Sequence, residues 1–235
     1  MLEDPLRLLL SVVLQSAILA VVTIGLFWAG IFAARRFGGS GAGYSLAPLG
    51  FVRPRSGVFL GVVTGVLVGL GLFLMSVIVG FLSVLVLEKF GYSADNTAQE
   101  PLMSGLRDWV GENPGVAIPA AFLVVAVIGP AVEELVFRGA IFGGLLRLAE
   151  RLLRRKDGDK PGSGARWTAF VGAAVLSSAL FATLHISAVI IPAIFILAVT
   201  LCALYWKTGS LLPNFIAHAT FNSIVVLAIV LSGLL

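Results

Sequence analysis

Two adjacent glutamates and an arginine, Glu133, Glu134 and Arg138, interrupt the longest apolar region of the sequence, residues 116–146. Charged side chains at membrane depth cost on the order of a few kcal/mol each, so they usually face a protein interior or a wet cavity and have partners. In a helix Glu134 and Arg138 lie on one face at i,i+4, which predicts an ion pair. Glu133 then points about 100° away from that face. The spacing predicts a structural carboxylate, Glu134, beside an available one, Glu133.

The sequence contains two histidines, and both lie in apolar stretches that we expect to be helices. His185 ends the run that starts at Phe181, and His218 shares a helix face with Asn222 at i,i+4. A lone buried histidine is more often a packed polar residue that hydrogen-bonds a neighbouring helix, and Phe181 alone is more often a packing residue. Two histidines, an asparagine and a glutamate pair on three separate apolar stretches instead predict a hydrolytic site.

The chemistry of this site follows from the residue types. Amide hydrolysis needs an activated water, a group that takes its proton, and donors for the developing oxyanion. Glu133 can be the base, and Asn222 can donate to the oxyanion or fix the ring of His218. His185 and His218 can hold the water, or together with Glu133 they can ligate a Zn²⁺ that leaves a coordination position open. The residues leave both the metal and the metal-free mechanism open.

The composition is that of a polytopic membrane protein. Of the 235 residues 59% are apolar and 12% are charged, which excludes an ordinary soluble domain. The 27 glycines suit close helix packing in lipid. We expect membrane lipids and a membrane-associated protein or peptide substrate as partners, and no nucleic acid.

Six apolar stretches predict an all-α bundle of about six transmembrane helices, with the active site between the third, fourth and sixth. We expect a single membrane domain, with N-terminal helices and an acidic loop over residues 1–114 and a catalytic core over residues 115–235. The predicted spans are residues 8–34, 58–87, 116–146, 167–185, 189–206 and 211–235.

The charges between the spans predict an orientation. Residues 35–55, 147–166 and Lys207 are basic and fall on one side of a six-span protein, whereas the acidic residues 88–114, with a short surface helix around 102–110, fall on the other. By the positive-inside rule the basic side is cytoplasmic, and the basic 147–166 segment touches anionic headgroups there. We expect an integral protein of a prokaryotic plasma membrane.

Three short motifs resemble those of the CAAX protease and bacteriocin-processing (CPBP) family of intramembrane endopeptidases, which includes the type II CAAX prenyl endopeptidases. They are Glu133-Glu134-x-x-x-Arg138, Phe181-x-x-x-His185 and His218-x-x-x-Asn222. Each motif alone is weak, but the three occur in the family's order on separate spans, and the resemblance covers about residues 115–230.

The resemblance implies an all-helical membrane fold whose active site opens to the cytosol. It implies that Glu133 activates water, with His185, His218 and Asn222 around it. The family is described both as metalloproteases and as metal-free glutamate peptidases, so the expected cofactor is Zn²⁺ or none. The implied activity is cleavage of a peptide bond in a membrane-associated substrate, either a prenylated CAAX-type peptide or another membrane peptide.

Two other classes of function compete with a protease. Intramembrane Glu and His residues also build the relays of ion or proton transporters, although the sequence has no inverted repeat and no paired broken helices. A non-catalytic scaffold that binds membrane peptides is the third hypothesis.

Helix lengths add a prediction about shape. His218 lies about 10 Å from the preceding turn and His185 about 27 Å from Trp167 at 1.5 Å per residue. The two histidines share one site only if the third and fourth helices continue beyond the membrane as a hairpin over residues 147–155 and 167–175.

Overall fold

The computed structural model describes residues 5–38, 43–91, 100–153, 162–185 and 187–234, and within these ranges it contains helices and no strand. The elements are α1 (Pro5–Gly38), η1 (Ala47–Leu49), α2 (Val58–Glu88), α3 (Glu100–Glu112), α4 (Pro114–Ala121), η2 (Phe122–Ile128), α5 (Gly129–Glu133), η3 (Glu134–Phe142), α6 (Gly143–Leu152), α7 (Ser163–Thr183), α8 (Ile191–Thr208) and α9 (Leu211–Leu234). Six helices in the described ranges are long and apolar enough to cross a membrane, which confirms the predicted polytopic bundle.

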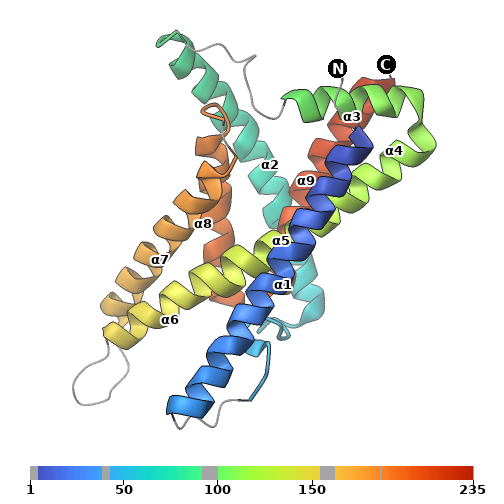
Figure 1. The fold of residues 1–235 in the computed structure, drawn as a ribbon. Helices are drawn as coiled ribbons and strands as arrows, with labels where there is room; N and C mark the ends of the chain where they lie inside the picture. Colours follow the sequence, from blue (N-terminus) through green and yellow to red (C-terminus); the bar gives the residue numbers. More distant parts are fainter. Residues whose placement is uncertain (1–4, 39–42, 92–99, 154–161, 186, 235) are drawn as a thin grey trace.

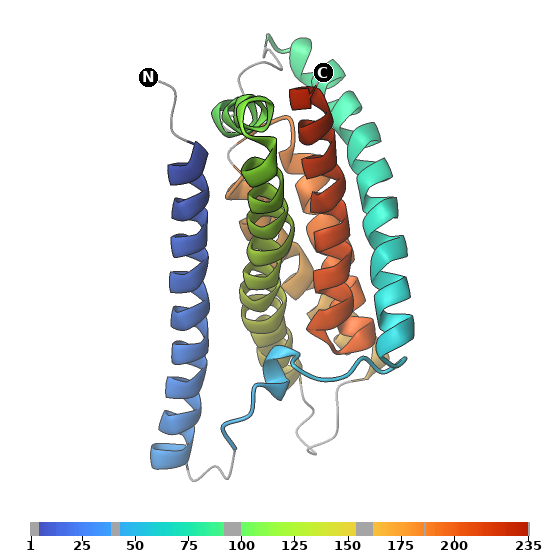
Figure 2. The same ribbon diagram turned by 90° about the vertical axis from the view of Figure 1, so that its right-hand side faces the viewer.

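The chain alternates between two ends of the bundle. The start of α1, the end of α9 and α3 lie at one end, and the C-terminal ends of α1, α6 and α8 lie at the other (Figures 1 and 2). The described parts of the basic segments therefore gather at one end of the molecule, and the described part of the acidic segment lies at the opposite end. At the acidic end α3 packs on α9 through Leu106 and Val110, which are 1% and 0% exposed. This confirms the short surface helix that the sequence predicts there.

The third span is one continuous helical rod from Pro114 to Leu152, built from α4, η2, α5, η3 and α6. The segments η2 and η3 are π-helical. Pro130 has no N–H to donate within the helix, and such interruptions are frequent at functional sites. The junction between α5 and η3 falls between Glu133 and Glu134, so the helical pattern changes at the glutamate pair.

The helix pair α2 and α9 sets the position of the C-terminal part of the site. The two helices lie side by side (Figure 2). Gly65 and Gly69 face α9 so closely that a Cβ atom would lie 2.8 Å from the Pro213 carbonyl oxygen and 2.5 Å from that of Ala217, respectively. Small residues of this kind let backbones approach in membrane bundles. The contact holds α9, which carries His218, against α2.

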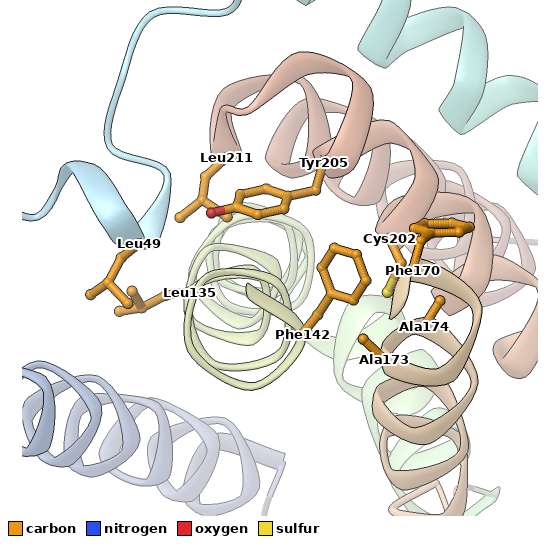
Figure 3. Close-up of a cluster of buried hydrophobic side chains, with 9 residues drawn as sticks. All are labelled: Leu49, Leu135, Phe142, Phe170, Ala173, Ala174, Cys202, Tyr205 and Leu211. Carbon is orange, nitrogen blue, oxygen red and sulfur yellow. The ribbon is translucent and has the colours of Figure 1, made fainter. Parts of the chain in front are cut away.

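The loop before α2 closes the basic end of the bundle. Leu211 donates its backbone N–H to the Gly50 carbonyl at 3.0 Å, and Arg147 donates to the Pro48 carbonyl at 2.7 Å. A buried hydrophobic cluster lies next to this loop (Figure 3). Its side chains come from the third span and from η1, α7, α8 and α9, which pack around that span. The loop is therefore part of the packed structure at the end where α9 begins.

Both helices of the predicted hairpin are present in the described residues. Helix α6 continues past residue 146 to Leu152, α7 begins at Ser163, and the two pack together with Arg166 Nε 3.6 Å from Glu150 Oε1. Residues 154 and 155 of the predicted hairpin lie outside the described ranges. The Phe170 ring stacks at 4.5 Å on that of Trp206 near the end of α8, so this part of α7 lies level with the end of α8. Contrary to the prediction, it does not project beyond α8 over residues 167–175.

We predict that Gly69→Ala destabilises the protein by about 1–3 kcal/mol, the usual cost of overpacking, because the new methyl group collides with the α9 backbone. The matched control is Gly71→Ala on the same helix, where a Cβ meets nothing within 4 Å. Thermal unfolding of the detergent-purified proteins measures the difference. Equal unfolding midpoints for the two variants would contradict the close α2–α9 contact.

Candidate active site

Glu134 is the centre of a buried polar network that joins the third span to α9. Its side chain is 1% exposed. Its Oε1 lies 3.0 Å from Arg138 Nη1 and 2.8 Å from His218 Nδ1, and its Oε2 accepts from Asn214 Nδ2 at 3.3 Å. The i,i+4 ion pair that the sequence predicts is therefore present. The same carboxylate also fixes the His218 ring.

Glu133 points away from this network, as the helical spacing predicts. Its side chain is 37% exposed, against 1% for Glu134. Its Oε2 lies 3.6 Å from Nε2 of His218, which is longer than a direct hydrogen bond. His218 thus has a carboxylate at each ring nitrogen: a buried one in contact with Nδ1 and a more exposed one near Nε2.

His185 reaches the same region from α7. The apolar pattern predicts that the fourth span ends at His185, but α7 ends at Thr183 and His185 lies in the following turn, before α8 begins at Ile191. The turn is tightened by a hydrogen bond from the His185 backbone N–H to the Ala182 carbonyl at 3.1 Å. The side-chain Nδ1 lies 3.0 Å from the Phe181 carbonyl oxygen. The fourth span is therefore shorter at this end than the apolar pattern indicates.

Phe181 brings the parts of the site together. Its buried ring lies 4.9 Å from the ring of His185 and 6.1 Å from that of His218, measured between centroids. The Arg138 guanidinium carbon lies 4.7 Å from the centre of the same ring, a cation–π geometry. Among the described residues no hydrogen bond or ion pair joins His185 to Glu133. The Phe181 ring therefore packs against the rings of both histidines.

Asn222 has a structural partner in the third span. Its Nδ2 donates to the Val125 carbonyl at 2.8 Å. In a π-helix this carbonyl would accept from the N–H five residues later, but that residue is Pro130, which has none. The Asn222 amide supplies the missing donor, so it ties α9 to the interrupted helix. The ring of His218 is oriented by Glu134.

Asn214 belongs to the network and is missed by the sequence analysis. Its side chain is fully buried and donates to the Leu201 carbonyl at 2.7 Å as well as to Glu134. The signal was available, because Asn214, His218 and Asn222 recur every four residues and so lie on one face of α9. Asn214 links α8, α9 and the third span.

The residues do not form a three-ligand zinc site as they are arranged. Zinc would need Glu133, His185 and His218 to converge on one point. Within the described part of the chain, no group of three His, Cys, Asp or Glu side chains is placed to hold a metal ion. The dependence on Zn²⁺ stays a prediction.

An open pocket of about 490 Å³ leads from the basic end to the glutamate network. Glu134 and Ala131 line its inner side, and the loop before α2 and the start of α9 form its other walls. The lining residues are Gly50, Phe51, Val52, Arg53, Pro54, Val58, Ala131, Glu134, Ser210, Leu211, Leu212 and Phe215. The walls are mostly apolar, so the pocket suits an apolar or amphipathic group.

The fold and the site define a polytopic helical membrane domain with a paired glutamate and two histidines at its centre. The profile of the family described as type II CAAX prenyl endopeptidase Rce1-like matches residues 115–224. The chain is 34% identical over 110 residues to the membrane-embedded CAAX protease MroQ of Staphylococcus aureus (strain USA300), a match that covers 47% of this chain and 39% of the relative. No solved structure matches. Residues 115–224 are therefore similar to the CAAX prenyl endopeptidases that the three motifs resemble, and the match spans about two fifths of the length of the bacterial relative.

We predict that Glu134→Gln destabilises the protein by about 3–5 kcal/mol, because it leaves the Arg138 charge buried without its counter-ion. The control is Glu150→Gln, which removes a carboxylate from the more exposed pair with Arg166 and should change stability by less than about 1 kcal/mol. Thermal unfolding in detergent compares the two. A Glu134→Gln protein as stable as the Glu150→Gln protein would refute the structural role of the buried pair.

Proposed function

We propose that this chain is an intramembrane endopeptidase that hydrolyses a peptide bond of a membrane-associated substrate, with Glu133 activating the water. The observation that carries the proposal is the position of His218 between two carboxylates, with Glu134 at 2.8 Å on Nδ1 and Glu133 at 3.6 Å from Nε2. The family match of residues 115–224 and the name of the bacterial relative support the same activity.

Glu134 prepares His218 for its role. An ionised carboxylate can accept hydrogen bonds but cannot donate them. In its hydrogen bond with Glu134 it is therefore His218 Nδ1 that carries the hydrogen. In the proposed mechanism both ring nitrogens are donors, since Nε2 also carries a hydrogen. That N–H then donates to the oxyanion that forms on the scissile carbonyl. Asn222, one turn further along α9, is the proposed second donor through the amide N–H that it does not give to Val125.

Glu133 and His185 hold and activate the water. The Phe181 carbonyl oxygen can only accept, so Nδ1 of His185 carries the hydrogen and Nε2 presents a lone pair that can accept from a water. Glu133 takes a proton from that water, and the hydroxide adds to the carbonyl carbon. When the carbon–nitrogen bond breaks, Glu133 returns the proton to the leaving amine. The proton that leaves the water is thus the one that the leaving amine receives. The mechanism uses Glu133 as a partly exposed base beside Glu134, which is buried and fixed.

We propose that the substrate enters from the cytoplasmic side. The 490 Å³ pocket is lined by the loop before α2 and the start of α9, which lie at the end where the described basic residues gather, and basic segments face the cytoplasm. The mostly apolar walls suit the hydrophobic part of a membrane peptide, and Arg53 at the pocket suits a carboxylate such as a peptide C-terminus. A prenylated CAAX-type peptide and an unprenylated membrane peptide both fit this description.

We predict that Glu133→Gln lowers the cleavage rate by about 10²–10⁴-fold, because glutamine keeps the shape but cannot take the proton. The assay uses purified protein with a membrane-embedded fluorogenic peptide, offered with and without a prenyl group. Its thermal unfolding midpoint should match that of the wild type, because the replaced side chain is partly exposed. Cleavage at the wild-type rate would leave a transporter or a peptide-binding scaffold as the better hypothesis.

We predict that the activity survives treatment with a strong zinc chelator. Among the described residues Glu133, His185 and His218 do not form a group of three ligands around one point, as a catalytic zinc ion would need. The measurement is the cleavage rate before and after chelation, together with the zinc content of the protein. Loss of activity on chelation and its return with one equivalent of Zn²⁺ would establish the metal mechanism instead.

A further inference from the structure

A second pocket, of about 510 Å³, lies at the basic end among α6, α7, the end of α8 and the loop before α2. We propose that it binds the phosphate group of an anionic phospholipid. Its lining includes Arg55, Arg166, Lys207, Glu150, Tyr205 and Trp206. None of these residues belongs to the glutamate–histidine site, so this proposal stands independently of the protease.

The length of α8 places the pocket at headgroup level. Helix α8 has 18 residues from Ile191 to Thr208. At 1.5 Å per residue it spans about 27 Å, close to the thickness of the hydrocarbon core, so both of its ends lie near the membrane boundaries. Lys207 is in the last turn, and the Trp206 ring stacks on Phe170 at 4.5 Å beside the exposed Trp167. Tryptophans are typical of this depth.

The cations of the pocket come from three different parts of the chain. Arg55 precedes α2, Arg166 is in the first turn of α7, and Lys207 is in the last turn of α8. Glu150 offsets one of them through its 3.6 Å contact with Arg166. The lining therefore carries an excess of positive charge, which suits the single negative charge of a phosphodiester.

Arg55 is held in place before any ligand arrives. Its backbone N–H donates to the Thr208 carbonyl at 3.3 Å, and its Nη1 donates to the Lys207 carbonyl at 3.2 Å. Its side chain crosses Gly209, whose φ is +68° and whose missing Cβ would lie 3.6 Å from Arg55 Nε. A guanidinium has five N–H donors, so others remain for phosphate oxygens. The turn at Gly209 thus orients a phosphate-binding group.

The walls favour a lipid over a soluble phosphate. Leu146, Tyr205 and Trp206 add apolar surface to the same lining. A phospholipid presents this combination, because its phosphate adjoins the glycerol and the acyl chains. Basic pockets between transmembrane helices at the cytoplasmic side bind anionic headgroups in this way.

The test measures the thermal unfolding midpoint of the full-length protein in a neutral detergent with added phosphatidylglycerol, phosphatidylcholine or inorganic phosphate. We expect phosphatidylglycerol to raise the midpoint by about 5 °C at saturation, since a ligand that binds only the folded state stabilises it. Phosphatidylcholine and inorganic phosphate should each give less than half of that shift. An equal shift with phosphatidylcholine would refute the preference for an anionic lipid, and an equal shift with phosphate would refute the lipid as the source.

Two matched double variants separate the pocket from general attraction to charge. Arg166→Gln combined with Lys207→Gln should remove most of the shift. Arg36→Gln combined with Arg151→Gln removes the same charge from exposed positions near the same end, outside the pocket lining, and should keep it. Both variants keep Arg55, so the fixed turn is preserved. Equal shifts in the two variants, whether retained or lost, would overturn the proposed site.

Discussion

The buried carboxylate of Glu134 is the interaction on which the rest of the site depends. A charge this deep is tolerated only with partners, and it has three, contributed by its own helix and by α9. Because His218 and Asn214 satisfy the carboxylate, the third span and α9 must meet at this depth. One electrostatic requirement therefore fixes both the helix contact and the direction in which the His218 ring points.

The surrounding packing makes that contact possible. The glycines of α2 bring α9 close, and Asn222 supplies the hydrogen bond that Pro130 removes from the third span. Because neighbouring residues of a helix point about 100° apart, the two consecutive glutamates face different surroundings, one buried in the network and one partly exposed. In the proposed mechanism the buried Glu134 orients His218 and the partly exposed Glu133 exchanges a proton with water, and these two roles call for different degrees of burial.

The basic end serves the site in two ways. The loop before α2 forms a wall of the pocket that reaches Glu134, and its Arg55 is bound to the turn between α8 and α9. That turn leads directly into the helix that carries Asn214 and His218. An anionic lipid held by Arg55, Arg166 and Lys207 would therefore brace the same turn from the membrane surface.

The sequence alone determined the membrane class, the six spans, the Glu134–Arg138 pair and the outward direction of Glu133. These follow from apolar length and helical spacing, which are local properties of the chain. It could not determine which carboxylate holds His218, because that depends on how two helices far apart in sequence are rotated against each other. The same reason hides the roles of Asn214 and Asn222, whose partners Leu201 and Val125 are backbone carbonyls that carry no side-chain signal. The end of α7 before His185 and the Arg55 contact with the α8 turn were likewise decided by tertiary packing, because turns and loops take their conformation from the helices they join.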